Sequence, residues 1–169
     1  MKNGSERRAF SLVELVIVIV IIGVIAAIAV PRISRGAKGA GAAAVRGNLA
    51  TLRNAIEVYA AEHGGEFPAF KDNLEATFVA QMTGKTDLAG TPGSGAGFIY
   101  GPYVRDIPIL PVGPNAGKSP PPNGVIVAAT GPTVDETNLT AAWTYNSVTG
   151  EIRANTDDPD ENGDPYNTY

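Results

Sequence analysis

The sequence predicts an α+β fold in which a long N-terminal helix, first membrane-spanning and then amphipathic, packs on a small antiparallel sheet. Three observations lead to this expectation: an apolar run over residues 10–30, an apolar stripe at helical spacing over residues 45–59, and two alternating strands over residues 141–155. The 169 residues leave room for one anchor and one small soluble domain.

The apolar run is long enough to cross a bilayer. Between residues 12 and 30 the only charged residue is Glu14. At about 1.5 Å per residue this stretch forms a helix about 28 Å long, close to the roughly 30 Å of a bilayer's hydrocarbon core. A carboxylate at that depth costs about 2.5–3.5 kcal/mol or more, so we expect Glu14 to have a partner or a function.

A partner for Glu14 follows from its spacing to Phe10, which lies one helical turn earlier. A cut between Ala9 and Phe10 would give Phe10 a positive α-amino group, which could pair with Glu14 in its own chain or in a neighbouring one. Two other interpretations of the run are an uncleaved single-span anchor and a secretory signal peptide cleaved after residues 27–29. Neither explains an acidic residue at that depth.

The stretch RRAFSLVELVIVIVIIGVIAAIAVPRI resembles the N-terminal segment of the type IV pilin and type II secretion pseudopilin superfamily. The resemblance implies that a prepilin peptidase removes the basic leader between Ala9 and Phe10, and that Phe10 is then N-methylated. It assigns filament assembly to Glu14 and a helix kink to Pro31. One departure is Ala9, because the family usually has Gly before the cut.

The resemblance divides the chain into four parts: a leader (1–9), a transmembrane and assembly helix (10–30), its amphipathic continuation (31–63) and a globular head (64–169). Pro31 and several following glycines are expected to weaken the helix before it resumes at Ala42. His63, the only histidine, lies near the predicted helix end, where we expect an exposed capping role.

The head is expected to contain a short helix over residues 74–82, capped by Asn73, and three strands. An apolar strand over 124–130 precedes a hairpin over 141–155, whose side chains alternate between apolar and polar. This hairpin, WTYN followed by TGEIRAN, resembles the late hairpin of pseudopilins. GPY followed by IP-x-x-P resembles the central loop of the major pseudopilin of type II secretion, but VGPN replaces its usual acidic and tryptophan residues.

The acidic tail contains a candidate calcium site. Oxygen donors alternate at Asp158, Asp160 and Asn162, as in the first half of an EF-hand loop. Asp164 is a fourth candidate ligand. The second half of the motif does not fit, because its twelfth position falls on Tyr169. The resemblance to the major pseudopilin implies calcium near the C-terminus, whereas a solvated acidic tail and a filament contact surface are the alternatives.

Composition argues against catalysis and against nucleic-acid binding. The chain has no cysteine and one histidine, and it shows no nucleophile–base set, phosphate loop or zinc ligand cluster, so we predict that it is not an enzyme. Removal of residues 1–9 leaves ten basic and sixteen acidic residues, a formal charge of −6. A nucleic-acid-binding surface is instead basic.

The resemblance implies a structural pseudopilin subunit that polymerises through its N-terminal helix into a periplasmic filament of a type II secretion system. The alternatives are a type IV pilin for adhesion, twitching or DNA uptake, and an anchored binding module that never polymerises. The implied partners are further copies of the chain, a prepilin peptidase and methyltransferase, minor pseudopilins and an inner-membrane assembly platform. Basic residues flank the run on both sides, so a single pass with a cytoplasmic N-terminus and a periplasmic head rests on the resemblance.

Overall fold

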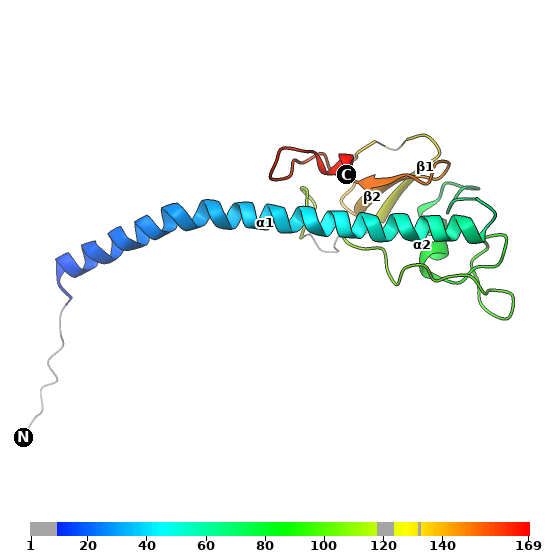
Figure 1. Cartoon of the computed structure of the whole chain (residues 1–169), viewed down its shortest axis with the longest axis horizontal. Helices are drawn as coiled ribbons and strands as arrows, with labels where there is room; N and C mark the ends of the chain where they lie inside the picture. Colours follow the sequence, from blue (N-terminus) through cyan, green and yellow to red (C-terminus); the bar gives the residue numbers. More distant parts are fainter. Residues whose placement is uncertain (1–9, 118–123, 132) are drawn as a thin grey trace, which may run out of the picture. The chain divides into compact units, whose positions relative to one another are not determined.

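The computed structural model describes residues 10–117, 124–131 and 133–169. The chain divides into two compact units, Met1–Ala37 and Lys38–Tyr169, and we call the second the C-terminal unit. The elements are, in order, helix α1 (Leu12–Glu62), helix α2 (Glu75–Thr83), strands β1 (Gly124–Ala128), β2 (Ala141–Asn146) and β3 (Ile152–Ala154), and the 3-10 turn η1 (Tyr166–Thr168) (Figure 1). The expected α+β class is confirmed.

The first part of α1 is apolar on every side. Over Leu12–Ala29, which we call the anchor segment, mean hydropathy is 3.2 and none of the residues is buried. Ile17, Ile19 and Ile22, which point in different directions around the helix, are 53%, 58% and 59% exposed. Among the described residues, α1 is the one helix long and apolar enough to cross a membrane.

Helix α1 continues unbroken through Pro31 and the glycines that follow it. The expected loss of helix before residue 42 is therefore wrong, whereas the kink at Pro31 stays a prediction, and the side chains of residues 30–37 lie outside the described part. Gly41 shows one reason why a glycine stands in this helix. A Cβ there would lie 2.7 Å from Val112 Cγ1, so the missing side chain lets a loop pack against the helix backbone.

The apolar stripe of α1 is buried, as its spacing predicts. Its members are at most 2% exposed: Val45, Leu49, Leu52, Ile56 and Tyr59. They share one buried cluster with Trp143 and Tyr145 of β2 and Ile152 of β3. In Figure 1 the cyan part of α1 runs beside these strands. Full burial of each such side chain contributes about 1.5–3 kcal/mol, so this cluster is a main source of stability for the C-terminal unit.

The sheet has the order β1-β2-β3 and is mixed. Strands β2 and β3 are antiparallel, as the hairpin predicts, with Thr144 opposite Arg153. Strands β1 and β2 are parallel, with Ile126 opposite Thr144, so the expectation of an antiparallel sheet is wrong for this pair. The physical reason is the connection over residues 129–140. It is about a dozen residues long, which is enough for the crossover that a parallel pair requires.

Side chains from the helices protect both outer strands of the sheet. On β1, the main-chain N–H of Val125 donates to Glu75 Oε1 of α2 at 3.0 Å. On β3, Arg53 of α1 donates to the carbonyl oxygen of Ile152 at 3.1 Å. Main-chain groups on outer strands otherwise remain available for pairing with another chain.

Helix α2 begins one residue later than expected and is not capped by Asn73. Its N-cap is Leu74, which has no side-chain cap, and the main-chain N–H of Leu74 donates to Asp72 Oδ1 at 3.0 Å. Asn73 has a left-handed backbone with φ of 57°. Its side-chain oxygen accepts a hydrogen bond from Ser147 in the hairpin turn instead. The cap prediction is wrong because this side chain ties the start of α2 to the sheet.

His63 is buried, so the expectation of an exposed histidine is wrong. It is 6% exposed, and its ring stacks on that of Tyr59 with centroids 3.9 Å apart. Nδ1 donates to the carbonyl oxygen of Tyr59 at 2.8 Å, and Nε2 lies 3.0 Å from Thr86 Oγ1. The loop after α2 covers the end of α1, and the histidine fills the space between them.

Candidate functional site

The first turn of α1 forms a capping box that contains Glu14. Glu14 Oε2 accepts a hydrogen bond from the main-chain N–H of Ser11 at 2.9 Å, and Ser11 Oγ accepts one from the N–H of Val13 at 3.3 Å. These reciprocal bonds satisfy N–H groups that have no partner inside the helix. Ser11 was not among the residues predicted from the sequence, although Ser-x-x-Glu before an apolar run is a recognised signal for a helix start.

This turn places Glu14 close to the predicted cleavage point. Its carboxylate reaches the N–H of Ser11, the residue directly after Phe10. An α-amino group on Phe10 would therefore belong to the residue next to the one that the Glu14 carboxylate contacts. Phe10 itself is 79% exposed. Ala9 lies outside the described residues, and the roles of Ala9, Phe10 and Glu14 in cleavage, methylation and assembly stay predictions.

The anchor segment presents a continuous apolar surface to its surroundings. Every large apolar residue of it is between 44% and 77% exposed: Leu12, Val13, Leu15, Val16, Ile17, Val18, Ile19, Val20, Ile21, Ile22, Val24, Ile25 and Ile28. A surface of this size is not stable in water. Lipid chains or other apolar helices must therefore cover it. Both environments are compatible with one acidic residue, Glu14, if an opposite charge pairs with it.

In the acidic tail, Asp160 organises a turn. Its Oδ1 accepts hydrogen bonds from the main-chain N–H groups of Asn162 at 2.7 Å and Asp164 at 3.0 Å, and its Oδ2 accepts one from the Tyr169 hydroxyl at 2.6 Å. The hydroxyl contributes most to holding the pKa of Asp160 down, to about 2. Asp160 is 4% exposed, so its acceptor sites face protein groups rather than solvent.

Two arginines of α1 hold the same tail. Arg46 lies 3.7 Å from Asp160 Oδ2 and stacks over the ring of Tyr169, with its guanidinium carbon 4.4 Å from the ring centroid. Arg53 donates to the main-chain oxygen of Tyr169 at 2.6 Å. The tail is therefore fastened to the helix rather than freely solvated.

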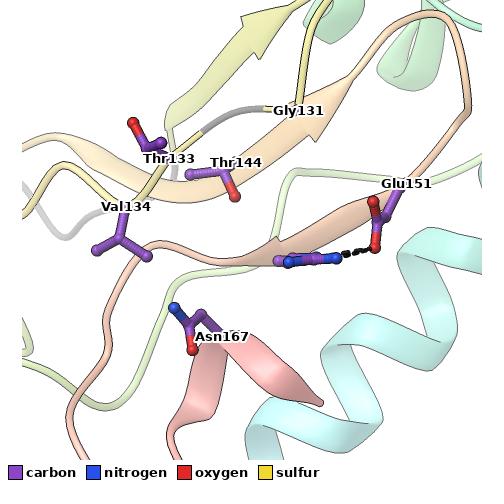
Figure 2. A pocket seen from close by; sticks show the side chains of 7 residues that line it. Gly131, Thr133, Val134, Thr144, Glu151 and Asn167 are labelled. Atoms are coloured by element: carbon purple, nitrogen blue, oxygen red, sulfur yellow. Dashed lines mark hydrogen bonds and ion pairs between the residues drawn. The ribbon is translucent and has the colours of Figure 1, made fainter.

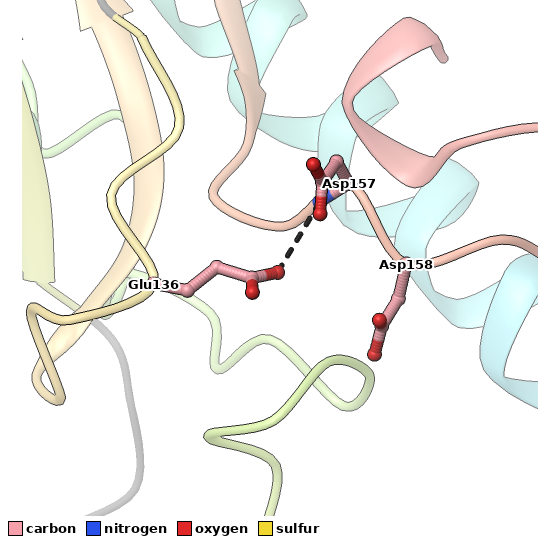
Figure 3. A group of neighbouring side chains, drawn as sticks. All are labelled: Glu136, Asp157 and Asp158. Atoms are coloured by element: carbon pink, nitrogen blue, oxygen red, sulfur yellow. Dashed lines mark hydrogen bonds between the residues drawn. The ribbon is translucent and has the colours of Figure 1, made fainter.

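Asp158 lies in a different acidic group from the one expected. Glu136, Asp157 and Asp158 each offer a carboxylate oxygen within 4.8 Å of the others (Figure 3). Glu136 comes from the β1–β2 connection, and its Oε1 accepts the N–H of Asp157 at 3.3 Å. Glu136 was not predicted from the sequence, because only the path of the β1–β2 connection brings it to the tail. Carboxylate oxygens are the donors that calcium prefers, and calcium binding stays a prediction.

A polar cleft of about 380 Å³ lies over β2 and β3 (Figure 2). Its lining includes Thr133, Thr144, Glu151, Arg153 and Asn167. Arg153 Nε donates to Glu151 Oε1 at 2.8 Å, so the two charges neutralise each other along one wall. These groups can hydrogen-bond to a polar solute or to water. The one histidine of the chain is buried at the end of α1, and the absence of enzymatic activity stays a prediction.

Comparison with known proteins identifies the N-terminal part of the chain. Residues 5–30 match the family described as "Prokaryotic N-terminal methylation motif". The chain therefore carries a prepilin-type signal, which implies processing by a prepilin peptidase and assembly at a membrane. No curated protein and no solved structure matches the chain. The chain therefore combines this N-terminal motif with an apolar helix and an α+β fold.

Proposed function

We propose that this protein is a structural pseudopilin subunit, which polymerises through α1 into a periplasmic filament of a type II secretion system. The observation that carries this proposal is the methylation motif over residues 5–30, on a helix whose anchor segment has no buried residue. Such a segment needs an apolar environment from outside its own chain. Lipid supplies that environment before assembly, and the helices of other copies supply it afterwards.

The assembly step rests on the charge of Glu14. A carboxylate in an apolar surrounding is costly, by about 2.5–3.5 kcal/mol or more, unless an opposite charge neutralises it. The N-methylated α-amino group of Phe10 supplies that charge in its own chain or in a neighbouring subunit. Within residues 10–117, 124–131 and 133–169, the carboxylate accepts one hydrogen bond, from Ser11, which leaves acceptor capacity for such a partner.

The proposal places the chain in the inner membrane with a cytoplasmic N-terminus and a periplasmic C-terminal unit. A prepilin peptidase and methyltransferase processes it, and minor pseudopilins and an inner-membrane assembly platform start and extend the filament. The small β2–β3 hairpin and the absence of cysteine support a pseudopilin over a type IV pilin, because many exported pilins contain a disulfide near the C-terminus. A pilin for adhesion, twitching or DNA uptake is the second candidate.

The first experiment is mass spectrometry of the protein from native membranes. We expect a chain that begins at Phe10 and carries one added methyl group. The matched genetic test compares Glu14→Ala with Val16→Ala, a neighbour in the same exposed apolar surface. Both variants should insert in the membrane, and only Glu14→Ala should fail to form filaments. Normal filaments from Glu14→Ala, or a native chain that begins at Met1, would contradict the proposal.

A deletion strain separates the two candidate functions. Loss of protein secretion with normal surface motility supports a pseudopilin, and loss of motility or DNA uptake with normal secretion supports a pilin. The neighbouring genes provide an independent indication, because a secretin and a secretion ATPase accompany the first function and a retraction ATPase the second.

We also propose that the C-terminal unit binds calcium through Glu136, Asp157 and Asp158. Three carboxylates that converge from two segments supply the hard oxygen donors, and water can complete the coordination. Asp160 supports the site indirectly by fixing the turn that follows Asp158.

A further inference from the structure

The connection between β1 and β2 contains the acceptor sequence for asparagine-linked glycosylation. Asn138, Leu139 and Thr140 form an Asn-x-Thr triplet in which the middle residue is not proline. All three residues are exposed and lie directly before β2. A second triplet, Asn3-Gly4-Ser5, falls within the predicted leader and outside the described residues.

The local geometry brings the asparagine and threonine side chains together. Asn138 Oδ1 accepts a hydrogen bond from the Thr140 hydroxyl at 3.0 Å and another from the Thr140 main-chain N–H at 3.2 Å. This compact turn presents the two recognised side chains side by side. Asn138 Nδ2 donates no hydrogen bond within the described part of the chain, so the nitrogen that would be modified is not engaged in the fold.

Two further features suit an acceptor site. The four residues 137–140 are all exposed, so a bulky group attached there would displace nothing from the core. The main chain nearby is held in place, because Asn115 Nδ2 donates to the carbonyl oxygens of Glu136 at 3.2 Å and Asn138 at 3.3 Å. An acidic side chain, that of Glu136, also precedes the asparagine by two positions.

We propose that Asn138 is an N-glycosylation site that accepts a saccharide from a lipid diphosphate carrier. Nδ2 attacks the anomeric carbon of the sugar, and the N–C bond forms as the C–O bond to the carrier breaks. The electron pair of that bond leaves on the lipid diphosphate, and the amide proton passes to a base of the transferase. This proposal rests on the proposed function in one respect, namely that the C-terminal unit faces the exported side of the membrane.

The test is peptide mass spectrometry of the protein purified from its native membranes. Trypsin is expected to release residues 119–153 as one peptide, which contains Asn138. We expect this peptide to carry the added mass of a saccharide, with sugar fragment ions. Thr140→Ala should abolish the added mass, whereas Thr140→Ser, which keeps the hydroxyl, should retain it. Asn138→Gln should abolish it as well, and the thermal unfolding of each variant checks that the fold persists.

The outcomes separate this proposal from the proposed function. An unmodified peptide from a chain that begins at Phe10, with its C-terminal unit open to protease added from the periplasmic side, overturns the glycosylation site and leaves the filament function intact. Added mass that persists in Asn138→Gln also overturns the site, because another residue then carries the saccharide. A chain that begins at Met1 overturns the filament function, whatever the mass of this peptide.

Discussion

The two parts of helix α1 contain similar apolar residues in opposite environments. Ile19 in the anchor segment is 58% exposed, whereas Ile56 in the C-terminal unit is 0% exposed. Around Ile56 the apolar positions recur every three or four residues and find partners in the sheet. Around Ile19 apolar residues lie on every side of the helix, so packing one face against a sheet would leave the others exposed. Other molecules must therefore supply the environment of Ile19, whereas the chain itself builds the environment of Ile56.

Two acids show the same contrast. Asp160 receives donors from Asn162, Asp164 and Tyr169, which occupy its oxygens within the tail. Among the described residues, Glu14 accepts one hydrogen bond, from the N–H of Ser11, which leaves acceptor capacity for a further partner. A carboxylate whose acceptor sites are all used within the fold stabilises that fold. A carboxylate with acceptor sites to spare is suited to binding a partner.

Matched isoleucine substitutions give the strongest test. Ile56→Ala removes buried atoms from the core and should lower the free energy of unfolding of the C-terminal unit by about 2–5 kcal/mol. Ile19→Ala should leave that value unchanged within about 0.5 kcal/mol, because Ile19 has no part in this core. Chemical denaturation in detergent, followed by the fluorescence of Trp143, measures both. Equal effects of the two substitutions would contradict the contrast between the two parts of α1.

Calcium should stabilise the C-terminal unit alone. A cation that binds only the folded state at a concentration 100 times its dissociation constant adds about 2.7 kcal/mol. Thermal unfolding with calcium and with a chelator measures this difference, and Glu136→Gln should remove it. Asp106→Asn, at an exposed acid that is not part of this group, is the control. The same response in the Glu136→Gln protein would show that calcium binds elsewhere.

Ser11→Ala should loosen the anchor segment without affecting the C-terminal unit. Loss of the capping hydroxyl costs about 1 kcal/mol, which corresponds to about fivefold faster amide exchange at Val13. Hydrogen exchange of the protein in lipid nanodiscs measures this rate. Ser11→Thr keeps an acceptor and should exchange like the wild type. An unchanged rate in Ser11→Ala would mean that the capping box does not persist in lipid.

The tail should detach from α1 in acid. Because the pKa of Asp160 lies at about 2, below its ordinary value near 3.9, its stabilising effect is fully present above about pH 4 and is lost as the pH falls toward 2. The ring signals of Tyr169 in NMR spectra report the loss of its contacts with Asp160 and Arg46. In Asp160→Asn the detachment should no longer follow this pH range. A wild-type tail that stays attached at pH 2 would contradict the prediction.

Sequence reasoning succeeded where the pattern is local and repeated. The apolar run and the buried stripe follow from spacing alone, and the β2–β3 hairpin follows from alternation around a short turn. It failed where contacts join distant segments. The parallel pairing of β1, the burial of His63 and the position of Glu136 beside Asp157 all depend on how loops return over the fold. Ser11 is a different case, because its signal was present in the sequence.

The hydrogen bonds from Glu75 to β1 and from Arg53 to β3 affect what happens when copies of the C-terminal unit are packed closely together. In the filament that we propose, subunits are held at very high local concentration, where an open strand edge would pair with the strand of a neighbour and lead to an amyloid-like aggregate. Two charged side chains occupy main-chain groups at those edges. In the proposed filament, neighbours would then meet through side-chain surfaces, which would allow subunits to separate again.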